Sequence, residues 1–279
     1  MRLATLLAAA VALVPAAPVA AQDADAQPSV FEGDHLSVGV GAGYGPSYDG
    51  SNDYVFTPVP LLQGSFHGVA IDPRSAGLAF DFIPNPKDGI GLNLGIVGHL
   101  RMNRSRQIED PVVRSLGKLD TAIEVGPTVG ITIPHVLDPY DALTFTTDVM
   151  WDVGGAHKGM VVDPMISYFT PLSHALAASV SVYGEYGDGK FADYYYSITP
   201  AGSAASGLPV FDASSGFSKA GARLFLGWDL DGNLENGGWA LFAIGGYARM
   251  LGDAKRSPVT SIRGSAGQWQ GAVGIGYTF

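Results

Sequence analysis

The chain of 279 residues contains no cysteine at all. A lipid-anchored lipoprotein needs a cysteine at its processing site, so that class is excluded, and disulfide bonds play no part in the fold. Charge is also scarce, at 15% of the residues, with 16 Lys and Arg against 26 Asp and Glu. Because nucleic-acid binding depends on basic side chains that neutralise phosphates, this balance excludes a nucleic-acid partner.

A long hydrophobic run is missing as well. Beyond the amino-terminal leader, the longest apolar stretch is Trp239–Ala248, which Gly245 and Gly246 interrupt and which is shorter than the roughly 18 residues that a membrane helix needs. Yet 47% of the residues are hydrophobic and 38 are glycine, a composition poor in charge for a soluble domain of this size. A transmembrane β-barrel explains both facts, because it places apolar residues at every second position of many short strands.

The amino end has the pattern of a secretory signal peptide. Arg2 supplies a positive charge, Leu3–Val14 an apolar core, and Val19-Ala20-Ala21 a cleavage site of small residues. We therefore expect residues 1–21 to be removed on export, residues 22–34 to form a flexible periplasmic lead-in, and residues 35–279 to form the barrel in the bacterial outer membrane.

The last stretch, Gln268–Phe279, shows the strongest two-residue period. Its apolar face carries an aromatic residue at each end, as a strand that crosses a membrane requires, and the opposite face carries small and polar residues. We interpret it as the closing strand of a barrel, although the last strand of a soluble β-sandwich would show the same alternation. The residues that we expect the barrel-assembly machinery to read as a signal are Val273, Ile275, Tyr277 and Phe279.

Eleven segments of the chain alternate in this way, for example residues 90–101. A single-chain bacterial barrel with both ends in the periplasm has an even number of strands. Dividing residues 68–82 into two short strands at Pro73 gives twelve, which we favour over ten. The predicted fold is thus all-β, an antiparallel transmembrane β-barrel of about 12 strands. The long loops at residues 44–54, 101–118, 187–216 and 252–267 are expected to face outward.

Several charged residues lie on the face of these strands opposite the apolar one. A basic side chain that faces lipid at mid-membrane costs about 2 to 4 kcal/mol, so the charged face should line the lumen. In a narrow barrel the acids and arginines would interlock as a structural network, an interpretation that we prefer to a conducting pore. The predicted network comprises Asp120, Glu124, Asp148, Asp152, Glu185, Arg223, Asp229 and Arg249, with Arg101 and Asp163 as further inward candidates.

No residue pattern indicates catalysis. None of the six histidines stands in a recognisable pairing with a serine and an acid; His99 with Ser105 and His157 with Asp152 come nearest. We expect no catalytic residue, no metal site and no cofactor. The run Tyr194-Tyr195-Tyr196 leaves two alternatives open, an exposed recognition surface or the packing of a long loop onto the barrel rim.

Three segments, in order along the chain, resemble the MipA/OmpV family of outer-membrane proteins. They are residues 43–54 with the following Pro58-Val59-Pro60, residues 191–200 with 206–213, and residues 252–259 before the closing strand. The resemblance covers essentially the whole mature chain and implies an outer-membrane barrel, but it includes no catalytic motif. One member of the family is a scaffold that brings a peptidoglycan-cleaving transglycosylase together with a peptidoglycan synthase, and others are surface proteins linked to adhesion or stress.

The resemblance therefore implies a non-enzymatic structural or scaffolding barrel. We expect its partners to be outer-membrane lipid and lipopolysaccharide around the wall, and peptidoglycan enzymes at the periplasmic turns. A narrow channel for small solutes is the alternative.

Overall fold

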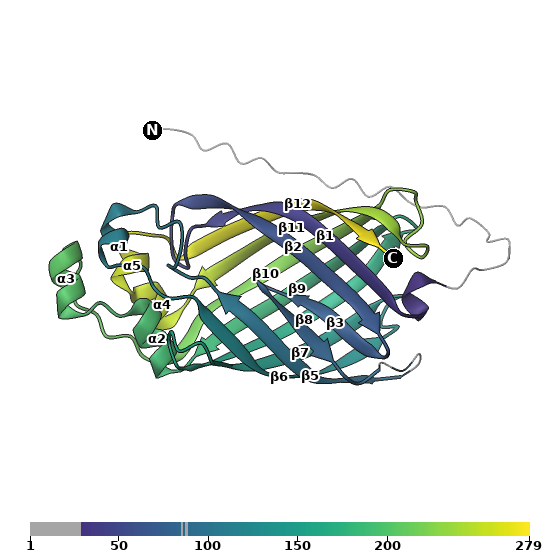
Figure 1. Ribbon diagram of the computed structural model, residues 1–279, viewed down its shortest axis with the longest axis horizontal. Coiled ribbons are helices and arrows are strands. Elements are labelled where there is room, and N and C mark those ends of the chain that lie inside the picture. Colours follow the sequence, from purple (N-terminus) through teal and green to yellow (C-terminus); the bar gives the residue numbers. More distant parts are fainter. Residues whose placement is uncertain (1–28, 85, 87–88) are drawn as a thin grey trace.

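The computed structural model describes residues 29–84, 86 and 89–279. Across these residues twelve antiparallel strands form a closed barrel in which each strand pairs with its neighbours in the chain and the last pairs with the first (Figure 1), so the predicted fold class is confirmed. The strands are β1 (His35–Pro46), β2 (Tyr54–Phe66), β3 (Val69–Arg74), β4 (Gly77–Asp81), β5 (Gly91–Arg101), β6 (Ala122–Pro134), β7 (Ala142–Asp152), β8 (Met160–Ser173), β9 (Leu176–Gly187), β10 (Gly216–Asp229), β11 (Gly238–Met250) and β12 (Gly267–Thr278).

The helices are short and lie in the loops. At one mouth of the barrel they are α1 (Pro111–Ser115), α2 (Gly189–Tyr196), α3 (Pro200–Ser206), α4 (Gly252–Arg256) and α5 (Pro258–Ser261), and a 3-10 turn, η1 (Val30–Glu32), precedes β1. Among the described residues no helix is both long and apolar enough to cross a bilayer. The mouth with short turns also holds both ends of the barrel chain (Figure 1), which is the periplasmic side in bacterial barrels.

The barrel closes where β12 pairs with β1. Val38 lies opposite Tyr277 and Val40 opposite Ile275, so both strands turn their apolar faces to the outside. Between them, on the inner face, glycine is required: a Cβ at Gly41 would lie 2.5 Å from the Val273 carbonyl oxygen and 2.9 Å from a Phe242 ring carbon. The ring of Phe242 therefore packs into the lumen directly against backbone.

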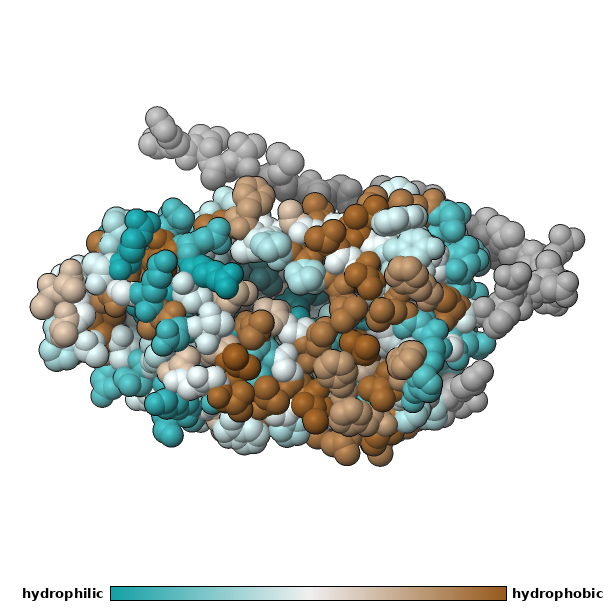
Figure 2. Space-filling view, viewed as in Figure 1, coloured by the Kyte–Doolittle hydropathy of each residue, from teal (hydrophilic) through white to brown (hydrophobic). Residues whose placement is uncertain are grey.

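Apolar side chains gather in a belt on the outer surface (Figure 2). On β12 the predicted alternation holds, because Val273, Ile275 and Tyr277 lie on the same outward face as the exposed Trp269. The Tyr277 ring lies 5.1 Å from that of Trp239 and 4.7 Å from that of Phe279, an aromatic group at the periplasmic rim. This belt is the surface that a strand barrel presents to lipid, which supports a location in the outer membrane.

Some predicted boundaries differ from the structure. The division of residues 68–82 into two strands is confirmed, but the turn lies at Ser75 and Ala76, where Ala76 has a φ of 54°, and Pro73 stays within β3. The loop 187–216, predicted as a long outward loop, contains α2 and α3. Asp188 and Thr199 directly precede these helices, and their side chains cap the N-terminal N–H groups.

The predicted signal peptide and residues 22–28 of the lead-in lie outside the described residues. In the described part of the lead-in, the Val30 N–H donates to the Glu235 carbonyl at 2.7 Å, so η1 contacts the turn between β10 and β11.

Candidate functional site

The outer loops form a cap over one mouth of the barrel. This outer cap consists of residues 102–121, 188–215 and 251–266, which carry the α-helices. Its interior is a hydrophobic core: Phe191, Tyr195 and Tyr196 of α2 are buried together with Met250 and Ala254. A second core cluster joins segments far apart in the chain, namely Tyr48, Ile108, Val113, Ile198, Leu208 and Val259.

Polar contacts pin α2 within the outer cap. Arg104 Nη1 donates to the Tyr195 carbonyl at 3.2 Å, Ser257 Oγ donates to the Tyr196 carbonyl at 2.6 Å, and the Asp120 N–H donates to Tyr194 Oη at 2.9 Å. Burial raises the pKa of the Tyr195 and Tyr196 hydroxyls, so both stay neutral. Of the two alternatives for the tyrosine run, the structure places Tyr195 and Tyr196 in the packing of the loop.

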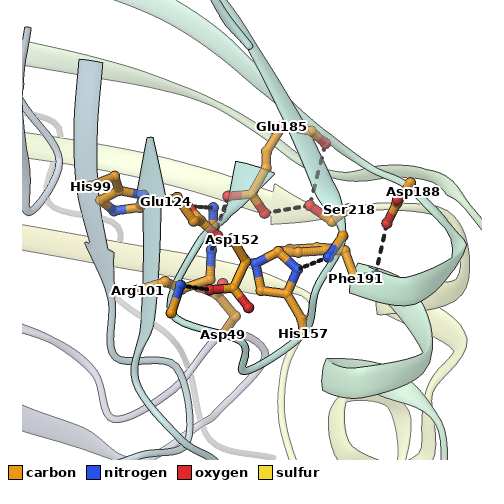
Figure 3. Close-up of polar contacts among 12 residues, drawn as sticks. Asp49, His99, Arg101, Glu124, Asp152, His157, Glu185, Asp188, Phe191 and Ser218 are labelled. Atoms are coloured by element: carbon orange, nitrogen blue, oxygen red, sulfur yellow. Dashed lines mark hydrogen bonds and ion pairs between the residues drawn. The ribbon is translucent and has the colours of Figure 1, made fainter. Parts of the chain in front are cut away.

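A charge cluster lies beneath the outer cap, at the outer end of the lumen (Figure 3). Arg101 of β5 contacts two carboxylates: its Nε lies 2.7 Å from Glu124 Oε1 on β6, and its Nη1 lies 2.6 Å from Glu185 Oε2 on β9. All three side chains are buried. The guanidinium also stacks on the Phe191 ring of α2, with 4.9 Å from Cζ to the ring centroid. One arginine thus ties three strands to the outer cap.

Two histidines complete the shell around Glu124. His99 Nδ1 lies 2.8 Å from Glu124 Oε2, and His157 Nε2 lies 2.9 Å from Glu124 Oε1. The N–H of Gly159 donates to His157 Nδ1 at 3.0 Å, so the proton on the neutral ring must sit on Nε2, which donates to Glu124. With Arg101, these donors satisfy both oxygens of a carboxylate that is fully buried.

The cluster continues from Glu185 to the first outer loop. A bulge in β10 at Ser218 directs its hydroxyl to Glu185 Oε1 at 2.5 Å. Next to it, Lys219 Nζ lies 3.4 Å from Glu185 Oε2 and 3.0 Å from Asp49 Oδ2. The loop between β1 and β2 is therefore anchored in the same network as β5, β6 and β9.

The structure brings together only part of the predicted lumen network. Glu124 and Glu185 lie in the charge cluster, and their partner is Arg101. Asp148 faces the lumen too, but its partner is Arg74 of the β3–β4 hairpin, whose Nε lies 2.8 Å from Asp148 Oδ2. Arg223 reaches the turn of the same hairpin, where its Nη2 donates to Ser75 Oγ at 2.7 Å.

For two residues the predicted place in the lumen was wrong. Asp120 is exposed in the loop before β6, and Arg249 is exposed on the outward face of β11, which also carries Trp239 and Leu241. Asp152 does lie on the inward face of β7, opposite Glu124, but its carboxylate accepts from the N–H groups of residues 154, 155 and 158 in the turn that follows. Asp229 does the same at the periplasmic end for residues 231–233. Asp152 and Asp229 thus lie at strand ends outside the charge cluster, Asp120 precedes β6, and the alternation of β11 places Arg249 on its outward face.

The geometry of the site is that of a structural network. Ser218 contacts Glu185 and not a histidine, and His157 contacts Glu124 and not Asp152, so no serine, histidine and acid form a triad in these contacts. Within the described chain no group of three or more histidine or acidic residues is arranged to hold a metal ion.

Comparison with known proteins agrees with this architecture. The family model described as MltA-interacting protein MipA matches residues 38–279. The chain belongs to the MipA family. None of the curated proteins compared with it matches significantly.

Several solved outer-membrane proteins are similar in outline at very low identity. The COG4313 outer membrane channel from Pseudomonas putida F1 has a TM-score of 0.47 and 13% identity, covering 94% of this chain and 100% of its own. The Ralstonia pickettii toluene transporter TbuX has a TM-score of 0.39 and 11% identity, covering 88% of this chain and 89% of its own. OmpT of Vibrio cholerae has a TM-score of 0.36 and 6% identity, covering 88% and 97%.

Proposed function

We propose that this MipA-family protein is a non-enzymatic outer-membrane barrel that acts as a scaffold for peptidoglycan-remodelling enzymes at its periplasmic end, after removal of residues 1–21. The observation that carries the proposal is the outer cap, packed as a hydrophobic core over the mouth and pinned by the Arg101, Glu124 and Glu185 cluster. A barrel closed in this way is suited to holding a shape, and less suited to passing solutes from end to end.

The periplasmic turn between β6 and β7 is built to hold a fixed shape. The Asp141 carboxylate accepts from the N–H groups of Val136, Leu137 and Asp138, and from the hydroxyl of Tyr168. Burial alone would raise the pKa of Asp141, but these hydrogen bonds hold it below its usual range. The turn consequently presents Leu137, which is 84% exposed, in a defined position, as an apolar contact for a partner protein needs.

The family description supplies the class of partner, since it names interaction with MltA. The mature barrel, purified from membranes and immobilised, should retain a lytic transglycosylase and a peptidoglycan synthase from the same cell envelope. L137S/Y140S should reduce this retention, while V210S, a single substitution of the same kind on the exposed surface of the outer cap, should not. Equal retention by all three proteins, or by none, would contradict the proposal.

Conductance separates this scaffold from a channel. In planar bilayers the protein should show no sustained current, and R101A should produce one by releasing the outer cap. A steady ohmic conductance of the unaltered protein would establish the channel instead. Mass spectrometry of the mature protein tests the export step, because its amino terminus should be Gln22.

A further inference from the structure

The barrel wall has an opening in its side, between β2 and the β3–β4 hairpin. β2 pairs with β1 from residue 54 to residue 65, all but its last residue, but with β3 through three pairs alone, Gly64–Ile71, Ser65–Ala70 and Phe66–Val69. β3 and β4 have six and five residues, so the hairpin ends where β2 still continues outward. Figure 1 looks onto this side of the barrel, and Figure 2 shows a hollow in the middle of this face.

Prolines prevent the hydrogen-bonded pairing of β2 with β3 from extending further outward. If the β2–β3 ladder continued in its register, residue 62 would face Pro73 and residue 75 would face Pro60. On β2, Pro58 and Pro60 have the same alternation as Gly64 and Phe66, whose backbone groups point toward β3. A proline has no N–H to donate, so each further hydrogen-bonded pair would lack a donor. The side opening is thus encoded in three proline positions.

The rim of the side opening is apolar on its outward face and polar on its lumen face. Phe56, Pro58 and Pro60 are exposed on the outward face of β2, whereas Thr57 and Gln63 are exposed on its lumen face. Unpaired backbone carbonyls at membrane depth are tolerated where they line water. At the outer end of the opening, Nε2 of Gln107 in the outer cap donates to the Phe56 carbonyl at 3.5 Å.

Immediately inside the side opening lies the guanidinium of Arg223, which has no acidic partner among the described residues. Arg223 Nη2 donates to Ser75 Oγ at the hairpin turn, the residue that would face Pro60, and its Cζ lies 5.3 Å from the centroid of the Tyr183 ring. Its Nε is buried and has no hydrogen-bond partner in the described chain. Arg74 and Arg101, the other lumen arginines described above, are both neutralised by carboxylates.

We propose that the side opening binds a long-chain amphiphile with an anionic head. The head group accepts hydrogen bonds from Arg223, including its free Nε–H, and the alkyl chain passes between β2 and the hairpin, across Pro58 and Pro60, into the outer leaflet. A lumen cation and an apolar slit to the membrane fit this ligand class and no neutral or short-chain solute. The ligand enters and leaves sideways, so the closed outer cap does not obstruct it.

The test uses the mature barrel in phosphatidylcholine nanodiscs and three probes of equal chain length: hexadecanoate, hexadecyl phosphate and hexadecanol. Both anions should bind, and the anion that binds more tightly identifies the head-group class. Hexadecanol should bind more weakly by about tenfold or more, because it lacks the charged hydrogen bond to Arg223. R223Q should weaken binding of the anions by a similar factor and leave hexadecanol unchanged. R223K should retain most of the affinity, and R249Q, an outward arginine on the next strand, should behave as wild type.

A hexadecanoate carrying a photoreactive group at the chain end locates the site. Labelling should concentrate on residues 54–63 and 69–77, and P58T/P60T/P73T, which restores the missing donors, should abolish it. Heat-modifiable gel mobility shows whether each variant is folded, and the P58T/P60T/P73T result stands independently if R223Q fails to fold. Equal binding of hexadecanol and hexadecanoate, or labelling spread evenly over the outward faces of all strands, would overturn the proposal.

Discussion

Lys219 Nζ lies 3.0 Å from Asp49 Oδ2, an ion pair that joins the first outer loop to strand β10 across 170 positions of the chain. The same ammonium approaches Glu185, which contacts Arg101, which contacts Glu124. One network of charges thereby joins the wall to the first outer loop, and Arg101 joins it to the outer cap through the Phe191 ring. Since such networks are worth more than the sum of their pairs, the cap and the wall should lose their structure together.

Removal of Arg101 tests this coupling. R101A leaves Glu124 and Glu185 buried without their shared cation, a change that typically costs about 3 to 5 kcal/mol. The temperature at which the folded barrel converts to its slow-migrating form on gels should fall markedly, and the loop 188–215 should become sensitive to protease. R106A, at an exposed arginine five residues later, should change neither. A normal transition temperature for R101A would show that the cluster contributes little.

Acid should loosen the loop that carries α1. Burial alone would raise the pKa of Asp110, but hydrogen bonds from Arg263 and from the N–H groups of Val113 and Val112 hold it below its usual value. A carboxyl whose pKa is lowered by folding stabilises the fold above its unfolded pKa of about 3.9, and this contribution is lost as the pH falls through the lower, folded value.

The measurement is proteolysis of residues 102–121 between pH 7 and pH 3, with D110N as the comparison. D110N should be cut faster than wild type at pH 7, and the two should converge toward pH 3. Parallel pH curves that keep a constant separation would show that Asp110 is not responsible.

The alternation of outward and inward residues on β12 predicts which introduced cysteines face the lipid. Because the chain has no native cysteine, each introduced one is the only label site. V273C and I275C should react with a lipid-soluble maleimide and resist a charged, membrane-impermeant one, since both residues face outward. Q270C and T278C lie on the inner face, where Thr278 Oγ1 is 2.7 Å from Ser37 Oγ, and should show the opposite preference. Equal labelling of positions 273 and 270 by the charged reagent is the contrary outcome.

The terminal residue provides the test of assembly. Phe279 is 69% exposed, its N–H donates to the Leu36 carbonyl at 2.9 Å, and its ring packs against that of Tyr277; the loss of these contacts at the exposed chain end should cost the folded barrel little. If Val273, Ile275, Tyr277 and Phe279 are read as an insertion signal, deletion of Phe279 alone should leave the protein exported but poorly inserted. Outer-membrane fractionation at steady state measures this, with T278A as a control that keeps the terminal ring. Normal outer-membrane levels of the truncated chain would show that these four residues do not act as an insertion signal that needs Phe279.

The strands were predictable because each has one lipid face and one lumen face, which imposes a two-residue period on the sequence. Even the split near Pro73 follows from the need for an even count. The helices of the outer cap were not predictable from the sequence, because they have four to eight residues and are stabilised by contacts with distant loops, such as Tyr48 with Val259.

The charge cluster shows what the two-residue period of the sequence could not predict. Alternation placed Glu124, Glu185 and Arg101 inside, and it could not say which acid meets which arginine, because that depends on strand height and tilt around the barrel. Arg249 has a strand position like the others, yet Tyr247 and Trp269 on the same face show that it points outward beside an aromatic rim. His99 and His157 gave no signal, since their common partner Glu124 is 25 and 33 residues away.

The outer cap also determines what an antibody can recognise on the intact protein. Its core is assembled from segments of at least three loops, and α2, the middle of the longest one, has Phe191, Tyr195 and Tyr196 turned inward. A linear peptide copied from residues 188–215 would display those rings and raise antibodies against surface that the folded protein hides. Epitopes on the native protein are therefore discontinuous, and immunisation requires the folded barrel.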